Sequence, residues 1–169
     1  MAAEIAASQT GEEAEPLAAL FAAESGHATP KVDVRGVVFR EGRVLLVRGR
    51  DDGLWTLPGG WAEVGESPRQ AVEKEVREES GYEVRAVKLI GVHDRDLRDR
   101  PRWPAHGYKL FFVCEPVQGR PVPPSGHETD AVGFFAADDL PPLSQRVGVK
   151  GLGWVFDHLR DPNLTADFD

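Results

Sequence analysis

The chain has 169 residues, of which 41% are hydrophobic and 28% are charged, and this composition is typical of a single globular domain. Its formal net charge of -8 argues against a protein that binds a nucleic-acid polymer through a broad basic surface, because neutralising phosphates requires clustered Lys and Arg. No segment approaches the roughly 18 apolar residues of a membrane helix, and the N-terminus lacks the basic start and long apolar run of a secretion signal. We therefore expect no association with a membrane and a cytoplasmic location.

Residues 1–30 are rich in Ala and Glu and predict an N-terminal extension with one short helix at 17–24. Runs of β-branched and aliphatic residues then predict a series of strands. The strands are expected at residues 32–39, 43–48, 54–57, 82–92, 108–115 and 132–135. The first two are joined through Glu41 and Gly42, which indicates a hairpin. A last helix is predicted at 151–160, where the apolar residues recur at helical spacing and are expected to pack in the core.

The segment 60–82, GWAEVGESPRQAVEKEVREESGY, concentrates glutamates between two glycines. Glu75, Glu78 and Glu79 share one face of the predicted helix, whereas Val72 and Val76 form a neighbouring apolar stripe. Like charges at this spacing repel one another and destabilise the helix, so their presence calls for an explanation. For an arbitrary Glu-rich helix the simpler interpretation is a solvated acidic face. The residues that flank this helix favour a binding site instead.

Both ends of the helix are well defined. Ser67 is a natural N-cap, Pro68 fits the first helical position, and Gln70 stands where a capping box would reach back to Ser67. Gly81 suits a left-handed C-cap, and residues 58–60 predict an irregular loop that can bring backbone carbonyls close to an ion. Magnesium takes carboxylate, carbonyl and water oxygens and usually shares substrate phosphates. The segment therefore predicts a magnesium site.

This segment resembles the Nudix box, G-x5-E-x7-R-E-U-x-E-E-x-G-U, where U is a bulky aliphatic residue. The matching residues are Gly60, Glu66, Glu75, Val76, Glu78, Glu79 and Gly81. Two positions depart from the pattern, because Lys74 stands where the family usually has Arg and Tyr82 where it usually has an aliphatic residue. A guanidinium can hold a carboxylate through two parallel hydrogen bonds and an ammonium cannot. We therefore expect Lys74 to orient a neighbouring glutamate less firmly.

The resemblance implies an α/β fold, the Nudix-type α/β/α sandwich with a mixed sheet and the box helix, over residues 31–160, with a C-terminal tail at 161–169. Other segments, ATPKVDVRGVVF, DGLWTLPGGWAEVGES, YKLFFVCE and VGFFAADDLPPLS, are similar to the branch that includes bacterial pyrophosphatases acting on CDP-choline and ADP-ribose. Those relatives carry a longer helical N-terminal segment that helps dimerisation. A homodimer is therefore one expectation, and the short extension here leaves oligomeric state and substrate open.

The reaction implied by the resemblance is hydrolysis of a nucleoside diphosphate linked to another moiety, with water attacking one phosphorus of the P–O–P bridge. Mg²⁺ is the expected ion, with Mn²⁺ as an alternative. By the same resemblance Glu75 and Glu79 are the first candidate metal ligands and catalytic residues, Glu78 follows, and the carbonyl of Gly59 completes the site. Glu66 is expected to orient the helix or the loop.

The general base is open, because in this family it comes from the box or from a later loop. Glu128, in SGHETD just before the last predicted strand, is a candidate, and a solvated loop carboxylate is the equal alternative. The loop HDRDLRDRPRWPAHGY is long and Pro-bounded, which favours a role in specificity. Arg95 could meet phosphate, and Trp103 or Tyr108 could stack on a base, although each is also explained as a solvated or packing residue.

Two other functions stay open at this point. One is a nucleotide-sensing module that keeps the fold and binds a ligand without cleaving it, and the other is a hydrolase of nucleoside triphosphates, including oxidised ones. Retention of Glu75, Glu78 and Glu79 argues against the sensor, because a pure sensor does not need a full set of magnesium-binding carboxylates. The expected partner is a small nucleotide in each case.

Overall fold

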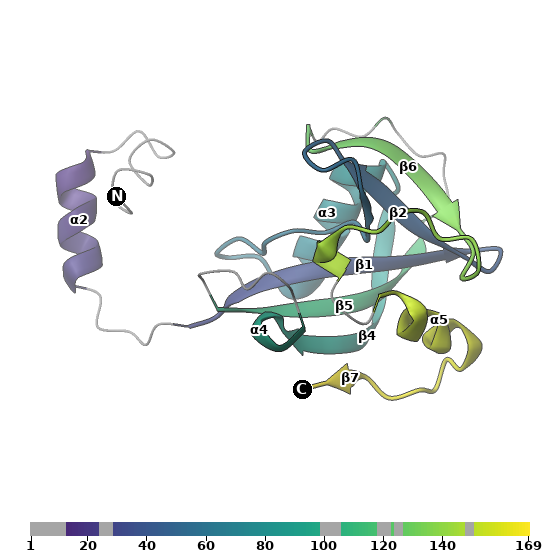
Figure 1. The fold of residues 1–169 in the computed structure, drawn as a ribbon. Coiled ribbons are helices and arrows are strands. Elements are labelled where there is room, and N and C mark those ends of the chain that lie inside the picture. Colours follow the sequence, from purple (N-terminus) through teal and green to yellow (C-terminus); the bar gives the residue numbers. More distant parts are fainter. Residues whose placement is uncertain (1–12, 24–28, 99–105, 118–122, 124–126, 148–150) are drawn as a thin grey trace.

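The computed structural model describes residues 13–23, 29–98, 106–117, 123, 127–147 and 151–169, and the elements below lie within them (Figure 1). The strands are β1 (Lys31–Arg40), β2 (Arg43–Gly49), β3 (Trp55–Thr56), β4 (Val84–Asp94), β5 (Gly107–Pro116), β6 (Thr129–Phe135) and β7 (Asp167–Phe168). The helices are α2 (Ala14–Ala23), α3 (Pro68–Ser80), α4 (Arg95–Arg98), α5 (Gly153–Arg160) and the short 3-10 helix η1 (Gln145–Val147). None of the helices described is long and apolar enough to cross a membrane.

The strands follow the order β3-β2-β1-β5-β4-β7, and β6 pairs with β2 outside this path. β1 lies parallel to β5, and β4 lies parallel to β7, whereas β4 and β5 are antiparallel. The sheet is therefore mixed, as predicted. β1 is its central strand, because it pairs with β5 along most of its length and with β2 at the hairpin end.

The predicted hairpin between β1 and β2 is confirmed. Its two central residues, Glu41 and Gly42, both have positive φ, 52° and 76°. A two-residue turn with this backbone matches the right-handed twist of the strands that it joins. The turn fixes the register in which Phe39 faces Val44.

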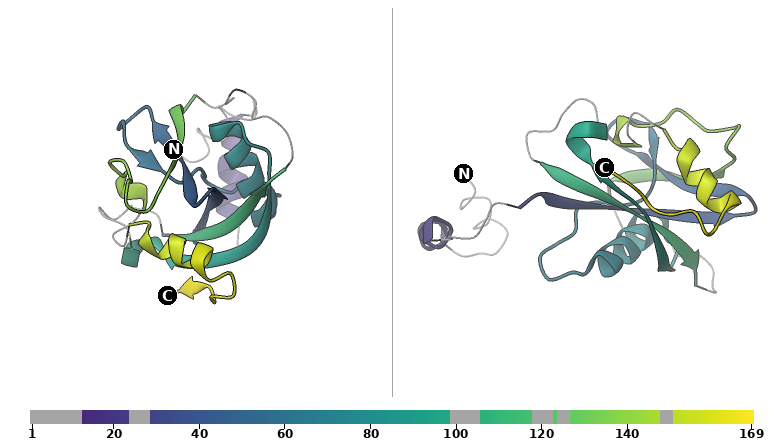
Figure 2. Two further views of the ribbon diagram at one scale, coloured as in Figure 1. Left: turned by 90° about the vertical axis from the view of Figure 1, so that its right-hand side faces the viewer. Right: turned by 90° about the horizontal axis from the view of Figure 1, so that it is seen from below.

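Two apolar cores lie on opposite faces of the strands, with α3 on one side and α5 on the other (Figure 2). Ala71, Val72 and Val76 of α3 pack on Val34 and Val38 of β1. The other core joins Val155 and Phe156 of α5 to the opposite face of β1 and β2. Alternating residues of β1 thus enter different cores, which is the period-two pattern of a strand covered on both sides. The α/β/α arrangement is confirmed.

Three differences from the sequence predictions concern the start of one helix and the presence of two short elements. The first helix begins at Ala14, three residues before its predicted start at Leu17. Residues Arg95–Arg98, predicted as loop, form the single helical turn α4. The C-terminal tail carries β7, which pairs with β4 and extends the sheet. Short elements of this kind depend on contacts with distant residues, so local patterns do not reveal them.

Candidate active site

The predicted start and end of the box helix are confirmed. Ser67 accepts a hydrogen bond from the amide of Gln70, and the Gln70 side chain accepts one from the Ser67 amide, with Pro68 at the first position of α3. At the other end Gly81 has a left-handed backbone, and its amide donates to the carbonyl of Arg77 at 2.9 Å. Because both ends are fixed, the glutamates of α3 hold a defined direction relative to the sheet.

The loop before α3 runs along β1 and is bound to it by backbone hydrogen bonds. The amides of Val34 and Gly36 donate to the carbonyls of Gly60 and Pro58, both at 2.8 Å. Gly59 has a φ of +145°, and a Cβ atom there would lie 2.0 Å from the carbonyl oxygen of Val34. Only glycine fits this position, since both the backbone angle and the space exclude a side chain.

The Gly59 amide donates to Oε2 of Glu79 at 2.8 Å. The Gly59 N–H group thus contacts the helix, and the Gly59 carbonyl stays a predicted metal ligand. The next residue, Gly60, is equally close to α3, because a Cβ atom there would lie 2.9 Å from Oε2 of Glu75. The two glycines therefore allow the loop backbone to reach the carboxylates of the helix.

The pKa values of Glu75 and Glu79 are both raised by their surroundings. Burial, followed by the charge of Glu79, raises the pKa of Glu75 to about 7, and the charge of Glu78 acts in the same direction. Burial also raises the pKa of Glu79, which the Gly59 hydrogen bond and nearby cations oppose. Half-buried carboxylates that repel one another are stabilised by a divalent cation, whose preferred ligands are oxygens of this kind. The donor set fits the ion that the box predicts.

Two buried side chains beneath this site, Asp33 and Arg35, were missed by the sequence analysis. The Arg35 guanidinium donates to both carboxylate oxygens of Asp33, at 2.7 and 3.0 Å, and to the carbonyl of Leu57 at 3.2 Å. Its charge acts on both Glu75 and Glu79. The pair thus holds β1 to the loop that precedes Gly59 and places a positive charge under the box carboxylates.

Lys74, the departure from the box pattern, contacts the loop. Its ammonium lies 2.9 Å from Oε1 of Glu66 and 3.1 Å from Oε1 of Glu63. The other oxygen of Glu66 accepts the amide of Glu63 at 3.2 Å. Lys74 therefore joins α3 to the turn at residues 63–66 through the two carboxylates of that turn. The contacts of Glu66 are those of a residue that supports the loop.

Glu128 lies beside the C-terminal turn of α3. Its carbonyl accepts the Arg50 amide at 2.9 Å, and the next residue, Thr129, donates its hydroxyl to the Glu79 carbonyl at 3.0 Å. The Glu128 side chain is exposed, and its negative charge contributes to the raised pKa of Glu79. The structure thus brings together Glu75, Glu78, Glu79, Gly59 and Glu128, although they come from three parts of the sequence.

Two of the residues proposed for substrate binding contact aromatic side chains. The Arg95 guanidinium lies 4.9 Å from the ring centroid of Trp61, and Tyr108 packs edge-on against His106. Both lie at the end of the sheet where β1 and β5 begin. Trp103 lies outside the described residues.

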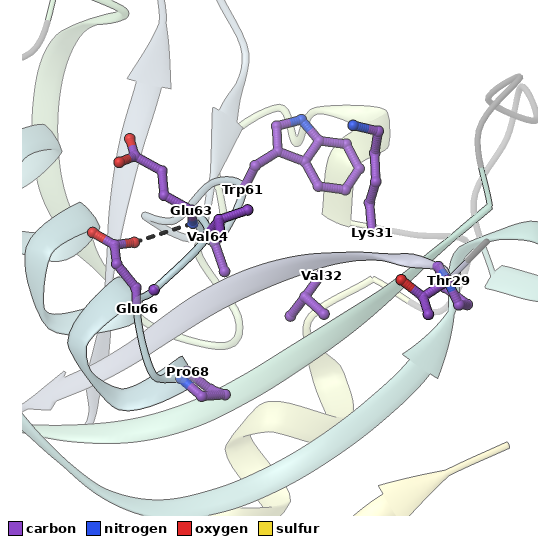
Figure 3. A pocket seen from close by; sticks show the side chains of 11 residues that line it. Thr29, Lys31, Val32, Trp61, Glu63, Val64, Glu66 and Pro68 are labelled. Atoms are coloured by element: carbon purple, nitrogen blue, oxygen red, sulfur yellow. Dashed lines mark hydrogen bonds between the residues drawn. The ribbon is translucent and has the colours of Figure 1, made fainter. Parts of the chain in front are cut away.

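Trp61 also lines a surface hollow of about 460 Å³ between the start of β1 and the loop before α3 (Figure 3). Lys31 and Val32 form one wall, and Glu63 and Val64 form another. None of the glutamates of α3 lines this hollow, and the two glutamates that do, Glu63 and Glu66, belong to the loop. It is therefore a separate feature from the carboxylate site.

A further group of donor atoms lies next to Arg95. One atom each of Asp94, Asp96 and His106 lies within 4.8 Å of the others. His106 Nε2 is 3.1 Å from Asp94, and the second Asp94 oxygen accepts the Asp96 amide. These contacts describe a histidine–aspartate hydrogen bond and the N-terminal turn of α4.

Known proteins are similar to this chain in sequence and in fold. The NUDIX domain family matches residues 29–151. The chain belongs to the NUDIX family. Over its full length it is 42% identical to YjhB of Bacillus subtilis strain 168, which is named as a candidate ADP-ribose pyrophosphatase, and it covers 81% of that protein. As a NUDIX protein with relatives of this kind, it is a hydrolase of the pyrophosphatase class.

Two solved structures are similar to this chain in fold and sequence. An ADP-ribose pyrophosphatase from Streptococcus suis 89-1591 has a TM-score of 0.73 and 38% identity, covering 83% of this chain and all of that chain. A UDP-X diphosphatase has a TM-score of 0.75 and 29% identity, covering 94% of this chain and 76% of that chain. The CDP-choline part of the expected branch stays a prediction.

The pairing of Asp33 with Arg35 in this NUDIX hydrolase has a signal in the sequence. They stand two residues apart in the otherwise apolar strand KVDVRGVVF, so both side chains leave the same face. Charged residues on a covered face are expected to pair. By contrast, no local pattern connects Arg50 or Thr129 to the box, because their contacts form only when β2, β6 and α3 meet.

Proposed function

We propose that this NUDIX hydrolase cleaves the pyrophosphate bond of a nucleoside diphosphate linked to another moiety, with ADP-ribose as the first candidate substrate and CDP-choline as the second. The observation that carries the proposal is the pairing of half-buried Glu75 and Glu79 beside the glycine loop, because their mutual repulsion favours binding of a divalent cation. The similarity to proteins named for ADP-ribose supports the choice of first substrate.

We propose Glu75, Glu78 and Glu79 as the residues that hold Mg²⁺, with Mn²⁺ as an alternative ion. The ion would supply positive charge to the diphosphate and lower the pKa of a bound water. The Gly59 amide keeps Glu79 in place by a hydrogen bond to one carboxylate oxygen, which leaves the other available. Arg35 offsets part of the negative charge from below. The site therefore combines a carboxylate that is held in place, Glu79, with the buried guanidinium of Arg35. This guanidinium does not compete with Mg²⁺ for the Glu79 oxygens.

Glu128 is proposed as the general base. It is exposed on the loop before β6, and its charge reaches Glu79, so it lies at the rim of the same site. In this role its carboxylate takes a proton from the attacking water, while the oxygen forms a bond to one phosphorus and the bridging P–O bond breaks. Glu128→Gln is then expected to lower kcat at least tenfold without lowering Mg²⁺ affinity, a combination that distinguishes a base from a metal ligand.

The proposal is tested by incubating the protein with a panel of substrates, with Mg²⁺ and with EDTA, and identifying the products. The panel contains ADP-ribose, CDP-choline, NADH, dinucleoside polyphosphates and oxidised nucleoside triphosphates. We expect AMP and ribose 5-phosphate from ADP-ribose with Mg²⁺ only. A higher kcat/KM for an oxidised triphosphate would favour the housecleaning alternative. Tight binding without cleavage of any compound would favour a sensing module and overturn the proposal.

The remaining sequence predictions stay proposals of the same kind. They are a domain at 31–160 with flanking segments, a homodimer, a cytoplasmic location and a substrate role for Arg95 and Tyr108. Size-exclusion chromatography with light scattering tests the dimer. Alanine variants of Arg95 and Tyr108 test the specificity role, through a change in the ratio of kcat/KM between ADP-ribose and CDP-choline.

A further inference from the structure

The segment that contains η1 is fixed by its main chain and by two neighbouring elements. The Ser144 amide donates to the Trp55 carbonyl, and the Ser144 hydroxyl donates to Asp52, both at 2.8 Å. On the other side, the ammonium of Lys109 donates to the carbonyl of Arg146. Lys109 is only 1% exposed, so this contact comes from inside the protein. The backbone at Arg146 is therefore held without help from the Arg146 side chain.

The Arg146 side chain points instead to the surface turn between β2 and β3, where its guanidinium pairs with Asp51. The side chains of Arg146 and Asp51 are 46% and 60% exposed, respectively. Ion pairs this open to water are weak, because water and salt screen both charges. A guanidinium paired in this way can exchange its partner for a stronger anion.

The same turn connects Arg146 to the candidate active site. The amide of Arg50, next to Asp51, donates to the carbonyl of Glu128 at 2.9 Å. Gly49 pairs with Thr129, whose hydroxyl donates to the carbonyl of Glu79 at 3.0 Å. Arg146 is thus joined to the rim of the box through one turn and one strand pair.

Two arginines place positive charge on Glu79, namely Arg35 and Arg146. Arg35 is buried, and Asp33 and the Leu57 carbonyl accept its hydrogen bonds. It cannot turn toward a ligand without breaking that buried pair. Arg146 has a half-exposed side chain and a partner on a surface turn, so of these two arginines it is the one that a substrate can reach.

We propose that Arg146 is an anion-binding residue of this enzyme, and that its guanidinium leaves Asp51 to bind non-bridging phosphate oxygens of the substrate diphosphate. In this inference the identity of the anion, a substrate diphosphate, rests on the proposed function. A guanidinium matches two phosphate oxygens at once, which makes Arg suited to this contact. Asp51 acts as an internal competitor that keeps the side chain oriented and lowers the apparent affinity for phosphate.

The test compares Arg146→Ala, Asp51→Asn and the double variant with Arg48→Ala as the matched control. Arg48 forms an exposed pair with Asp130 at 2.7 Å, with side chains 41% and 36% exposed, so like Arg146 it is a partly exposed arginine paired with a surface aspartate. Two measurements are made on the full chain. One is kcat and KM for ADP-ribose with Mg²⁺, and the other is the Kd of inorganic pyrophosphate with EDTA, by calorimetry.

We expect Arg146→Ala to raise KM and Kd roughly tenfold, with a smaller change in kcat, which corresponds to loss of one phosphate contact. Asp51→Asn should lower Kd a few-fold, and the double variant should behave like Arg146→Ala, because the competitor matters only when the arginine is present. Arg48→Ala should leave both values unchanged. Thermal melting of each variant checks that the fold is intact.

Several results would overturn the inference. Equal Kd values for Arg146→Ala and Arg48→Ala would remove Arg146 from the site, as would weaker binding by Asp51→Asn. The pyrophosphate measurement also separates this inference from the proposed function. If the wild type cleaves no compound yet binds pyrophosphate in a manner that depends on Arg146, the function fails and the anion site stands. If it binds no pyrophosphate with EDTA or with Mg²⁺, the anion site fails.

Discussion

The amide of Gly59 donates a hydrogen bond of 2.8 Å to Oε2 of Glu79, twenty residues further along the chain. This contact joins the glycine loop to the last turn of α3 and requires the loop to approach within reach of the helix. It is possible because Gly59 has no side chain, since the carbonyl of Val34 occupies the space that a Cβ atom would need. Gly59, the residue just before the box, is therefore a structural requirement of the carboxylate site.

Gly59→Ala tests this relationship. The added Cβ would lie 2.0 Å from the Val34 carbonyl, and the φ of +145° is strained for any residue with a side chain. We expect a loss of stability of about 1–3 kcal/mol from the backbone conformation alone, and at least a hundredfold loss of kcat/KM because Glu79 loses its fixed position. Thermal denaturation and steady-state kinetics measure both effects.

Gly65→Ala is the control for this change. Gly65 lies in the same loop and also has a positive φ, of 92°, but no atom lies within 4 Å of a Cβ built there. Its replacement should cost about 1 kcal/mol and leave kcat within a few-fold of wild type. If both variants lost activity equally, the close approach at Gly59 would not be the cause.

Asp33→Asn should destabilise the protein strongly. The substitution removes the charge that pairs with buried Arg35, and an uncompensated buried charge costs about 3–5 kcal/mol. Chemical denaturation measures the free energy of unfolding. The exposed pair between Arg48 and Asp130 provides the comparison, because Asp130→Asn should cost no more than about 1 kcal/mol. Similar losses for the two variants would contradict the structural role assigned to the buried pair.

Affinity for Mg²⁺ should depend on pH through Glu75. Burial and the charge of Glu79 raise the pKa of this carboxyl from 4.5 to about 7, and a metal ion binds its deprotonated form. The apparent Kd for Mg²⁺ should therefore be constant above pH 7 and rise by up to tenfold per pH unit below it. Calorimetric titration between pH 6 and pH 8.5 measures this dependence, and a flat profile would contradict the raised pKa.

The same shift affects the stability of the metal-free protein. The folded pKa of Glu75 lies above its usual value, so its contribution is fully present below about pH 4.5 and is lost as pH rises through about 7. Metal-free wild type should therefore lose part of its stability over this range, and Mg²⁺ should restore it. The glutamine side chain of Glu75→Gln does not titrate, so the stability of this variant should change less over the same pH range.

The helix and the positions of its glutamates were predictable because their causes are local. Ser67 and Gln70 form a capping box by their spacing alone, and Glu75, Glu78 and Glu79 share a face through the period of the helix. The two-residue turn at Glu41 and Gly42 was also recognised for a local reason. These parts of the fold follow from neighbouring residues, and the structure agrees with them.

The contacts made by Arg146 and Thr129 were not predictable in this way. Each depends on a partner more than forty residues away, Asp51 in one case and Glu79 in the other. Glu128 was selected from the sequence for its place in a loop, and it lies near α3 because the hydroxyl of the next residue, Thr129, donates to the Glu79 carbonyl. The strand β7 was not predictable for the same reason, since its two residues pair with β4, which is distant in the sequence.

The central claim is that the box glutamates hold a divalent ion for cleavage of a diphosphate, and Glu79→Gln tests it most directly. The measurement is the rate of AMP release from ADP-ribose with Mg²⁺, for the variant and the wild type, with the melting temperature as a check on folding. We expect the rate to fall by at least a hundredfold while the protein stays folded. Near-normal turnover by folded Glu79→Gln would contradict the claim.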